Sequence, residues 1–169
     1  KVDKENYEYF REPGFQDEFK MEAESRGECA GSLLDIMAIN LYDSIRNIYE
    51  AEDDFNLEEW NTVKQKCLNS ILKCSKMYVY LEGIEPQKEE EILTEFVNRI
   101  VPKNWLCNNW SDIKDNYFIW KYSSDSKQTA FEILDYTKKF VEDADKSYLR
   151  LLPNLKILEC AKATGEEDV

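Results

Sequence analysis

The chain contains no histidine among its 169 residues. Histidine is the usual base beside serine and cysteine nucleophiles, the usual axial ligand of haem and a common ligand in zinc and di-iron sites. Its absence excludes these chemistries in their ordinary form. Glycine and proline are also scarce, and no glycine pair has the spacing of a phosphate-binding loop. We therefore expect neither a cofactor nor a metal site.

Positive charge is in short supply as well. The chain has 22 Lys and Arg against 35 Asp and Glu, which gives a formal net charge of −13. Binding to nucleic-acid phosphates or to anionic lipid needs clustered cations. No apolar run approaches the roughly 20 residues of a membrane span. We expect no nucleic-acid partner and no membrane insertion, whereas a basic protein partner would be attracted by this field.

What the sequence has in abundance is apolar residues at three- and four-residue steps. They predict an all-α fold, a single-domain antiparallel helical bundle of about five to seven helices. We expect this helical domain at residues 15–163, between an N-terminal arm at 1–14 and a frayed tail at 164–169. Dense β-branched and aromatic residues leave one alternative open, a mostly α fold with a short strand pair near 77–81 and 117–122.

Several local features of the helices can be predicted. The acidic run 50–54 is expected to end the first long helix, and Asn56 to open the next one, because Glu59 follows it at capping-box spacing. Leu57 and Phe131 are each expected on a buried helix face. Pro153 is expected to end the last long helix.

The five cysteines fit no redox motif, and without histidine they make a poor zinc site. In helices folded back on each other, Cys29 lies nearly level with Cys74, and Cys67 can reach Cys107. We therefore predict the disulfides Cys29–Cys74 and Cys67–Cys107, with Cys160 free. The alternative is that the cysteines are free thiols that pack as small hydrophobic residues.

Three features favour an extracellular setting. One is the predicted cysteine pairing. Another is the sequon Asn109-Trp110-Ser111, which makes Asn109 a candidate for glycosylation. The third is that the chain begins with Lys1, as cleavage of a signal peptide would leave it, although an excised domain would begin in the same way. We predict a secreted protein, with a cytoplasmic one as the alternative.

The candidate binding residues are Trp105, Trp110, Tyr117 and Trp120, because aromatic side chains are dense in this segment and favoured at interfaces. The alternative is that these rings plug one end of the bundle. Carboxylate pairs such as Asp143 and Asp145 are interpreted as part of a solvated face.

The leading interpretation is a non-enzymatic, secreted helical binding protein. It would engage a protein partner or sequester a small hydrophobic ligand through the aromatic-rich patch. An intracellular helical scaffold or adaptor domain is the alternative. A carboxylate-based enzyme comes third, because no residue pattern suggests a nucleophile with its base.

Overall fold

A computed structural model describes the backbone of residues 31–164 and the side chains of residues 35–150. Its helices are α3 (Gly31–Asn56), α4 (Trp60–Val79), α5 (Glu89–Glu95), α6 (Ile113–Lys121) and α7 (Lys127–Thr164). A 3₁₀ turn at Tyr80–Glu82 extends α4, and a π-helical turn at Phe96–Ile100 with a 3₁₀ turn at Val101–Lys103 extends α5. No strand occurs between residues 31 and 164, so the predicted all-α fold is confirmed and the strand pair is wrong. The predicted N-terminal arm and the tail beyond Thr164 lie outside the described residues.

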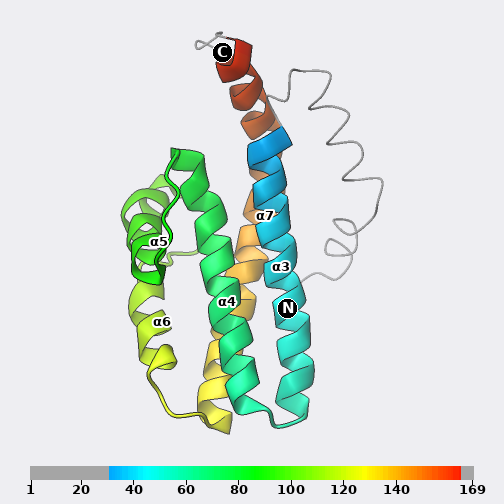
Figure 1. Ribbon diagram of the computed structural model, residues 1–169, viewed down its shortest axis with the longest axis vertical. Coiled ribbons are helices and arrows are strands. Elements are labelled where there is room, and N and C mark those ends of the chain that lie inside the picture. Colours follow the sequence, from blue (N-terminus) through cyan, green and yellow to red (C-terminus); the bar gives the residue numbers. More distant parts are fainter. Residues whose placement is uncertain (1–30, 165–169) are drawn as a thin grey trace.

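The three long helices α3, α4 and α7 lie side by side, and α5 with α6 forms a second layer against α4 (Figure 1). The chain runs down α3 and back up α4, as predicted for antiparallel neighbours. α7 does not run antiparallel to α4, because the chain comes back to the lower end through α5 and α6 before α7 begins. Lys64 near the start of α4 donates to the carbonyl of Ser123 just before α7, and Tyr78 near its end donates to the carbonyl of Ala144. These contacts show that α4 and α7 run parallel, which corrects the wholly antiparallel arrangement.

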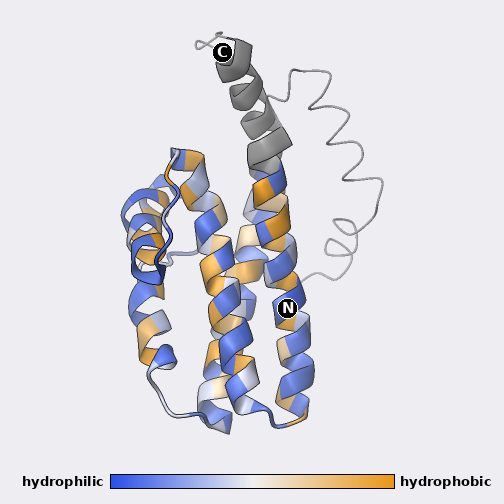
Figure 2. Ribbon diagram, viewed as in Figure 1, coloured by the Kyte–Doolittle hydropathy of each residue, from blue (hydrophilic) through white to orange (hydrophobic). Residues whose placement is uncertain are grey.

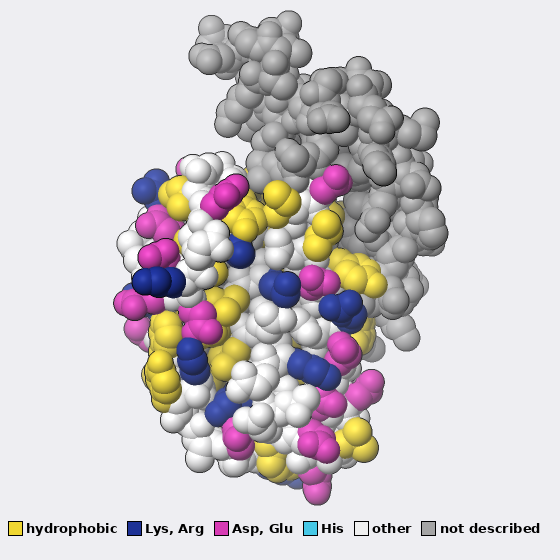
Figure 3. All heavy atoms as spheres, viewed as in Figure 1, with side chains coloured by type: hydrophobic (Ala, Val, Ile, Leu, Met, Phe, Trp, Pro, Cys, Tyr) yellow, Lys and Arg dark blue, Asp and Glu magenta, His cyan; other side chains and the backbone are white. Residues whose placement is uncertain are grey.

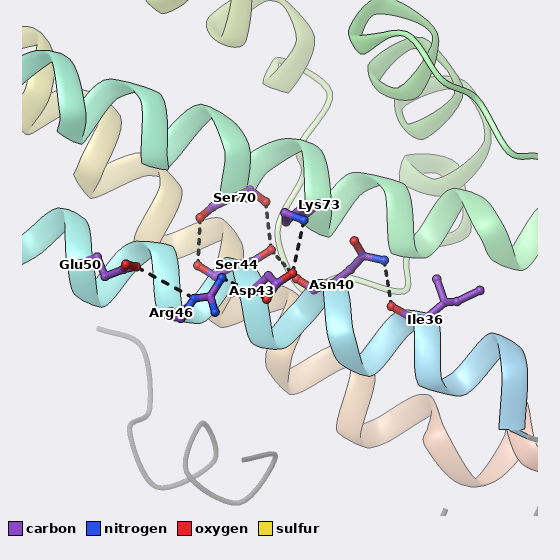
Figure 4. Close-up of polar contacts among 8 residues, drawn as sticks. All are labelled: Ile36, Asn40, Asp43, Ser44, Arg46, Glu50, Ser70 and Lys73. Atoms are coloured by element: carbon purple, nitrogen blue, oxygen red, sulfur yellow. Dashed lines mark hydrogen bonds and ion pairs between the residues drawn. The ribbon is translucent and has the colours of Figure 1, made fainter. Parts of the chain in front are cut away.

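Two buried serines let α3 and α4 approach closely (Figure 4). The hydroxyl of Ser70 donates to the carbonyl of Ser44 at 2.9 Å, and the hydroxyl of Ser44 lies 3.3 Å from the carbonyl of Ser70. Ser44 also donates to the carbonyl of Asn40 at 2.7 Å on its own helix. Nearby, Lys73 and Asp43 form an ion pair across the same interface. Reciprocal hydrogen bonds thus satisfy polar groups that would be costly to bury alone.

Hydrophobic and hydrophilic residues alternate along α3 and α4 at amphipathic spacing (Figure 2). Their apolar sides meet in one cluster that includes fully buried residues of every described α-helix. Leu93 of α5 and Phe96 in the turn after it belong to this cluster. The aromatic members Tyr78, Phe96 and Phe140 are buried at the contact between the long helices and the second layer. This shared core fixes the position of the loop and the short helices described below.

The turn between α3 and α4 differs from the sequence-based expectation. The acidic run 50–54 does not end α3, which continues to Asn56. Asn56 is therefore the last residue of one helix and not the cap of the next; Glu59 stands before α4 and makes no capping hydrogen bond. The prediction failed because carboxylates on a solvated helix face do not interrupt the backbone, so the helix can continue past them.

The length of α7 also differs from the prediction. The helix passes through Pro153 and continues to Thr164. Proline removes one backbone hydrogen bond, and within a long helix this can produce a bend and not an end. The expectation that Pro153 ends the last long helix is thus wrong, and the residues from Pro153 to Thr164 belong to α7.

Candidate functional site

One buried carboxylate organises the loop between α5 and α6. The Asp143 side chain projects from α7 and is 4% exposed. Its Oδ1 accepts the backbone N–H of Cys107 at 2.8 Å, and its Oδ2 accepts the backbone N–H of Asn108 at 2.9 Å. The same Oδ2 accepts the indole N–H of Trp110 at 2.9 Å. The loop is therefore tied to the core by a single acidic side chain.

These hydrogen bonds decide the charge state of Asp143. Burial by itself would raise the pKa of this carboxyl, because it penalises the charged form. The backbone N–H groups of Cys107 and Asn108 and the indole of Trp110 outweigh burial and lower the pKa below its usual value. Asp143 is thus an anion at neutral pH, and the expectation that it belongs to a solvated face is wrong. Asp145 is buried as well, at 2% exposure.

The predicted aromatic residues occupy different environments. Trp105 is half-buried, with its ring centroid 6.4 Å from that of Tyr78. Trp110 and Trp120 both contact the ring of Tyr136, at centroid distances of 5.2 Å and 5.0 Å. Both contacts are edge-to-face, the arrangement that aromatic quadrupoles favour.

The four predicted binding residues do not form one exposed surface. Trp110 is 6% exposed and Tyr117 2%, so both contribute mainly to the core, as in the alternative that these rings plug the fold. Trp105 and Trp120 are half-buried. Tyr117 lines a cleft.

That cleft lies between α4, α5 and α6, has a volume of about 300 Å³ and opens to solvent. We call it the α4–α6 cleft. Half of its lining residues are apolar or aromatic and half are polar or charged. The first group is Leu68, Leu72, Tyr117 and Tyr122, and the second is Gln65, Asn69, Glu89 and Lys121. None of the four polar residues was singled out from the sequence, because no local pattern shows that three separate helices meet here.

The ionisable groups of the cleft are held in their protonated or paired forms. Lys121 Nζ lies 2.5 Å from Glu89 Oε2, and this hydrogen bond is the main cause that raises the pKa of Lys121. Burial, together with the charge of Glu89, raises the pKa of Tyr117. At neutral pH neither Lys121 nor Tyr117 can therefore act as a general base, while Glu89 is engaged by a cation.

The cysteine pairing is also different from the prediction. Cys67, Cys74 and Cys107 are free thiols. Cys67 is buried beside Thr137, whereas Cys107 lies beside Asp143, six residues further along α7 and thus about 9 Å away along its axis. This separation explains why the predicted Cys67–Cys107 bridge is not formed. Cys74 is free too; its predicted partner Cys29 lies outside the described residues, and so does the side chain of Cys160.

Thiol labelling is expected to separate the described cysteines. Cys107 is exposed and should react with iodoacetamide in the native protein. Burial raises the pKa of Cys67 and of Cys74 to about 12, which lowers their thiolate fraction by about a thousandfold relative to a thiol of pKa 9. We expect both to stay unlabelled until denaturant is added, as site-resolved mass spectrometry would show. Labelling of neither Cys67 nor Cys107 in denaturant without reductant would contradict the free-thiol structure and restore the disulfide.

The remaining predicted features concern glycosylation, metal binding and the membrane. Asn109 is exposed and its side-chain oxygen accepts the backbone N–H of Ser111 at 2.9 Å, so its glycosylation stays a prediction. Among the described residues no three potential metal ligands come together. None of the described helices has the length and apolar character needed to cross a bilayer. No protein-family model, curated protein or solved structure matches the chain.

Proposed function

We propose that the chain is a non-enzymatic binding domain that holds an extended segment of a partner protein in the α4–α6 cleft. The observation that carries this proposal is a pair of exposed amides, Gln65 and Asn69, beside an apolar floor. Neither amide has a hydrogen-bond partner within the described part of the chain. They are free to donate to and accept from an incoming ligand.

The spacing of these amides suits a peptide backbone. Gln65 and Asn69 are one turn apart on α4, so they are separated by about 6 Å along the helix axis. Alternate residues of an extended chain are about 6.6 Å apart. The two side chains could therefore hydrogen-bond successive outward-facing peptide groups of one strand, while its intervening side chain enters the cleft.

The floor of the cleft suits one apolar side chain. Leu68, Leu72 and Tyr117 provide apolar contact, and a volume of about 300 Å³ is at the lower end for ligand sites. Tyr122, which also lines the cleft, is 76% exposed and stacks on Phe118 at a centroid distance of 6.3 Å. An exposed, preordered ring of this kind is typical of an interface anchor.

The same features argue against the other functions considered from the sequence. Sequestration of a small hydrophobic ligand calls for an enclosed apolar cavity, whereas half of the residues that line this cleft are polar. Catalysis calls for a free base or nucleophile, and Lys121, Tyr117 and Glu89 are protonated or paired. Binding of a partner protein suits both the secreted and the intracellular setting. Thiol labelling would distinguish the two settings, because paired cysteines favour the secreted one and free thiols the intracellular one.

A random peptide library displayed on phage and selected against the full chain would test the proposal. We expect selected peptides to bind Asn69→Ala and Tyr122→Ala at least about tenfold more weakly than the wild type. Both side chains are exposed, so these variants should fold normally, as circular dichroism would verify. Phe131→Ala is the control, because it removes another exposed ring from a different surface.

Two results would overturn the proposal. One is a selection that yields no peptide above background. The other is a set of peptides whose affinity does not change in Asn69→Ala and Tyr122→Ala, since such peptides would occupy another surface.

A further inference from the structure

We propose that the lower end of the fold, where α3 turns into α4 and α7 begins, is a docking surface for a basic amphipathic segment of another protein. We call it the tip surface and define it by four apolar residues: Phe55, Leu57, Trp60 and Phe131. It shares no residue with the α4–α6 cleft, so the inference goes beyond the proposed function and does not depend on it.

The tip surface contains two exposed apolar side chains and a group of three aromatic rings. Leu57 is 71% exposed and Phe131 57%. The ring of Phe55 lies 5.1 Å from that of Trp60 and 6.4 Å from that of Phe131, measured between centroids. Rings from α3, α4 and α7 are thus grouped around Phe55, and Leu57 is exposed on the turn that joins α3 to α4; exposed apolar groups gathered at one end of a fold mark interaction sites.

The exposure of Leu57 comes from a defined turn. The backbone N–H of Leu57 donates to the carbonyl of Asp53 at 3.2 Å, and that of Glu59 donates to the carbonyl of Asp54 at 2.9 Å. Between them Glu58 has a φ of 60°, a left-handed conformation that glycine adopts more easily. The turn therefore holds Leu57 away from the core, and the expectation that Leu57 is buried on α4 is wrong. A strained non-glycine residue at an exposed turn is itself a reason to look for function.

The charges around the tip surface are negative and partly unpaired. Three nearby carboxylates have lysine partners in ion pairs: Asp54 with Lys66, Glu52 with Lys138, and Asp125 with Lys64. Three others, Asp53, Glu58 and Glu59, form no ion pair among the described residues. Lys127, in the first turn of α7, is a nearby lysine that forms no ion pair among the described residues. Figure 3 shows acidic and hydrophobic side chains next to each other at this lower end.

This combination selects one kind of occupant. Leucine or phenylalanine side chains of a partner would cover Leu57 and Phe131, and lysine or arginine side chains would pair with Asp53, Glu58 and Glu59. A second copy of the chain would bring the same carboxylates face to face. Anionic nucleic acid or lipid would be repelled by a chain whose net charge is −13. A basic amphipathic segment satisfies both the apolar and the charged groups.

The test uses the full chain and a synthetic helical peptide of about 18 residues in which leucine and lysine recur at amphipathic spacing. Isothermal titration calorimetry should detect binding of this peptide to the chain. The double variant Leu57→Ala/Phe131→Ala should bind the peptide at least about tenfold more weakly. The triple variant Asp53→Asn/Glu58→Gln/Glu59→Gln should bind it more weakly as well. It should also reduce the dependence of the affinity on salt, because it removes the rim charges.

Matched controls keep the result specific. A peptide with glutamate in place of lysine should not bind, and Tyr122→Ala in the cleft should bind the lysine peptide like the wild type. Absence of binding, or equal affinity in the Leu57→Ala/Phe131→Ala variant, would overturn the inference. So would self-association of the wild-type chain that this variant abolishes in analytical ultracentrifugation, since a second copy would then be the occupant.

Discussion

Replacement of Asp143 by alanine is expected to lower the free energy of unfolding by about 3 kcal/mol. The substitution removes the acceptor of the backbone N–H groups of Cys107 and Asn108 and of the indole N–H of Trp110. Donors that lose a charged acceptor in a buried site are costly, because water does not readily replace it. Urea unfolding followed by tryptophan fluorescence and circular dichroism would measure the change.

A second carboxylate on α7 provides the control. Asp135 is exposed and pairs with Lys139 one turn away, so Asp135→Ala should change stability by less than about 0.5 kcal/mol. If Asp143→Ala were as stable as Asp135→Ala, the loop would not depend on its carboxylate anchor.

The pH dependence of this effect has a definite sign. The pKa of Asp143 is lower in the folded protein than in the unfolded chain, so folding favours its charged form. The resulting stabilisation is fully present above the unfolded-state pKa of about 3.9 and is lost as the pH falls through the folded-state pKa. The stability difference between the wild type and Asp143→Asn should therefore be constant near neutral pH and shrink below about pH 4. A difference that grows on acidification would contradict the assigned charge.

The anchoring role of Asp143 could not be predicted from its neighbours in sequence. Asp143 and its loop partner Asn108 are 35 positions apart, and only tertiary packing brings them together. One signal was nevertheless present, because Asp143 falls among Phe140, Val141 and Ala144 on the buried side of α7. A carboxylate at an apolar position of a periodic pattern indicates a buried partner.

The helices themselves were predictable for a local reason, since apolar spacing of 3.6 residues is encoded in each segment. What this spacing does not encode is the direction in which non-consecutive helices pair. The parallel course of α4 and α7 depends on the length of chain that α5 and α6 occupy between them. The α4–α6 cleft could not be predicted for the same reason, because Asn69, Glu89 and Lys121 come from three helices.

The sequence pattern also has to assign which residues of a helix face the core, and on α7 this assignment was partly wrong. The apolar pattern places Phe131 on the inner side together with Ala130, yet Ala130 is buried and Phe131 is 57% exposed. Adjacent residues differ by about 100° around a helix, and near the start of α7 this rotation turns Phe131 toward solvent while Ala130 faces the core. Phe140, which the pattern did not single out, is fully buried. The two phenylalanines on one helix therefore allow a matched comparison.

Phe140→Ala is expected to destabilise the fold by about 3–5 kcal/mol, whereas Phe131→Ala should change stability by less than about 1 kcal/mol. The Phe140 ring lies edge-on to Phe96 at 5.7 Å and to Trp110 at 5.1 Å, so its removal leaves a cavity between α7, the second layer and the anchored loop. Urea midpoints of both variants would measure the difference, and Phe140→Leu should fall between them if Phe140→Ala is too unstable to purify. Equal losses at the two positions would mean that the phase of α7 is wrong. That result would also contradict the packing of Phe140 against Trp110, which supports the hydrogen bond from Trp110 to Asp143.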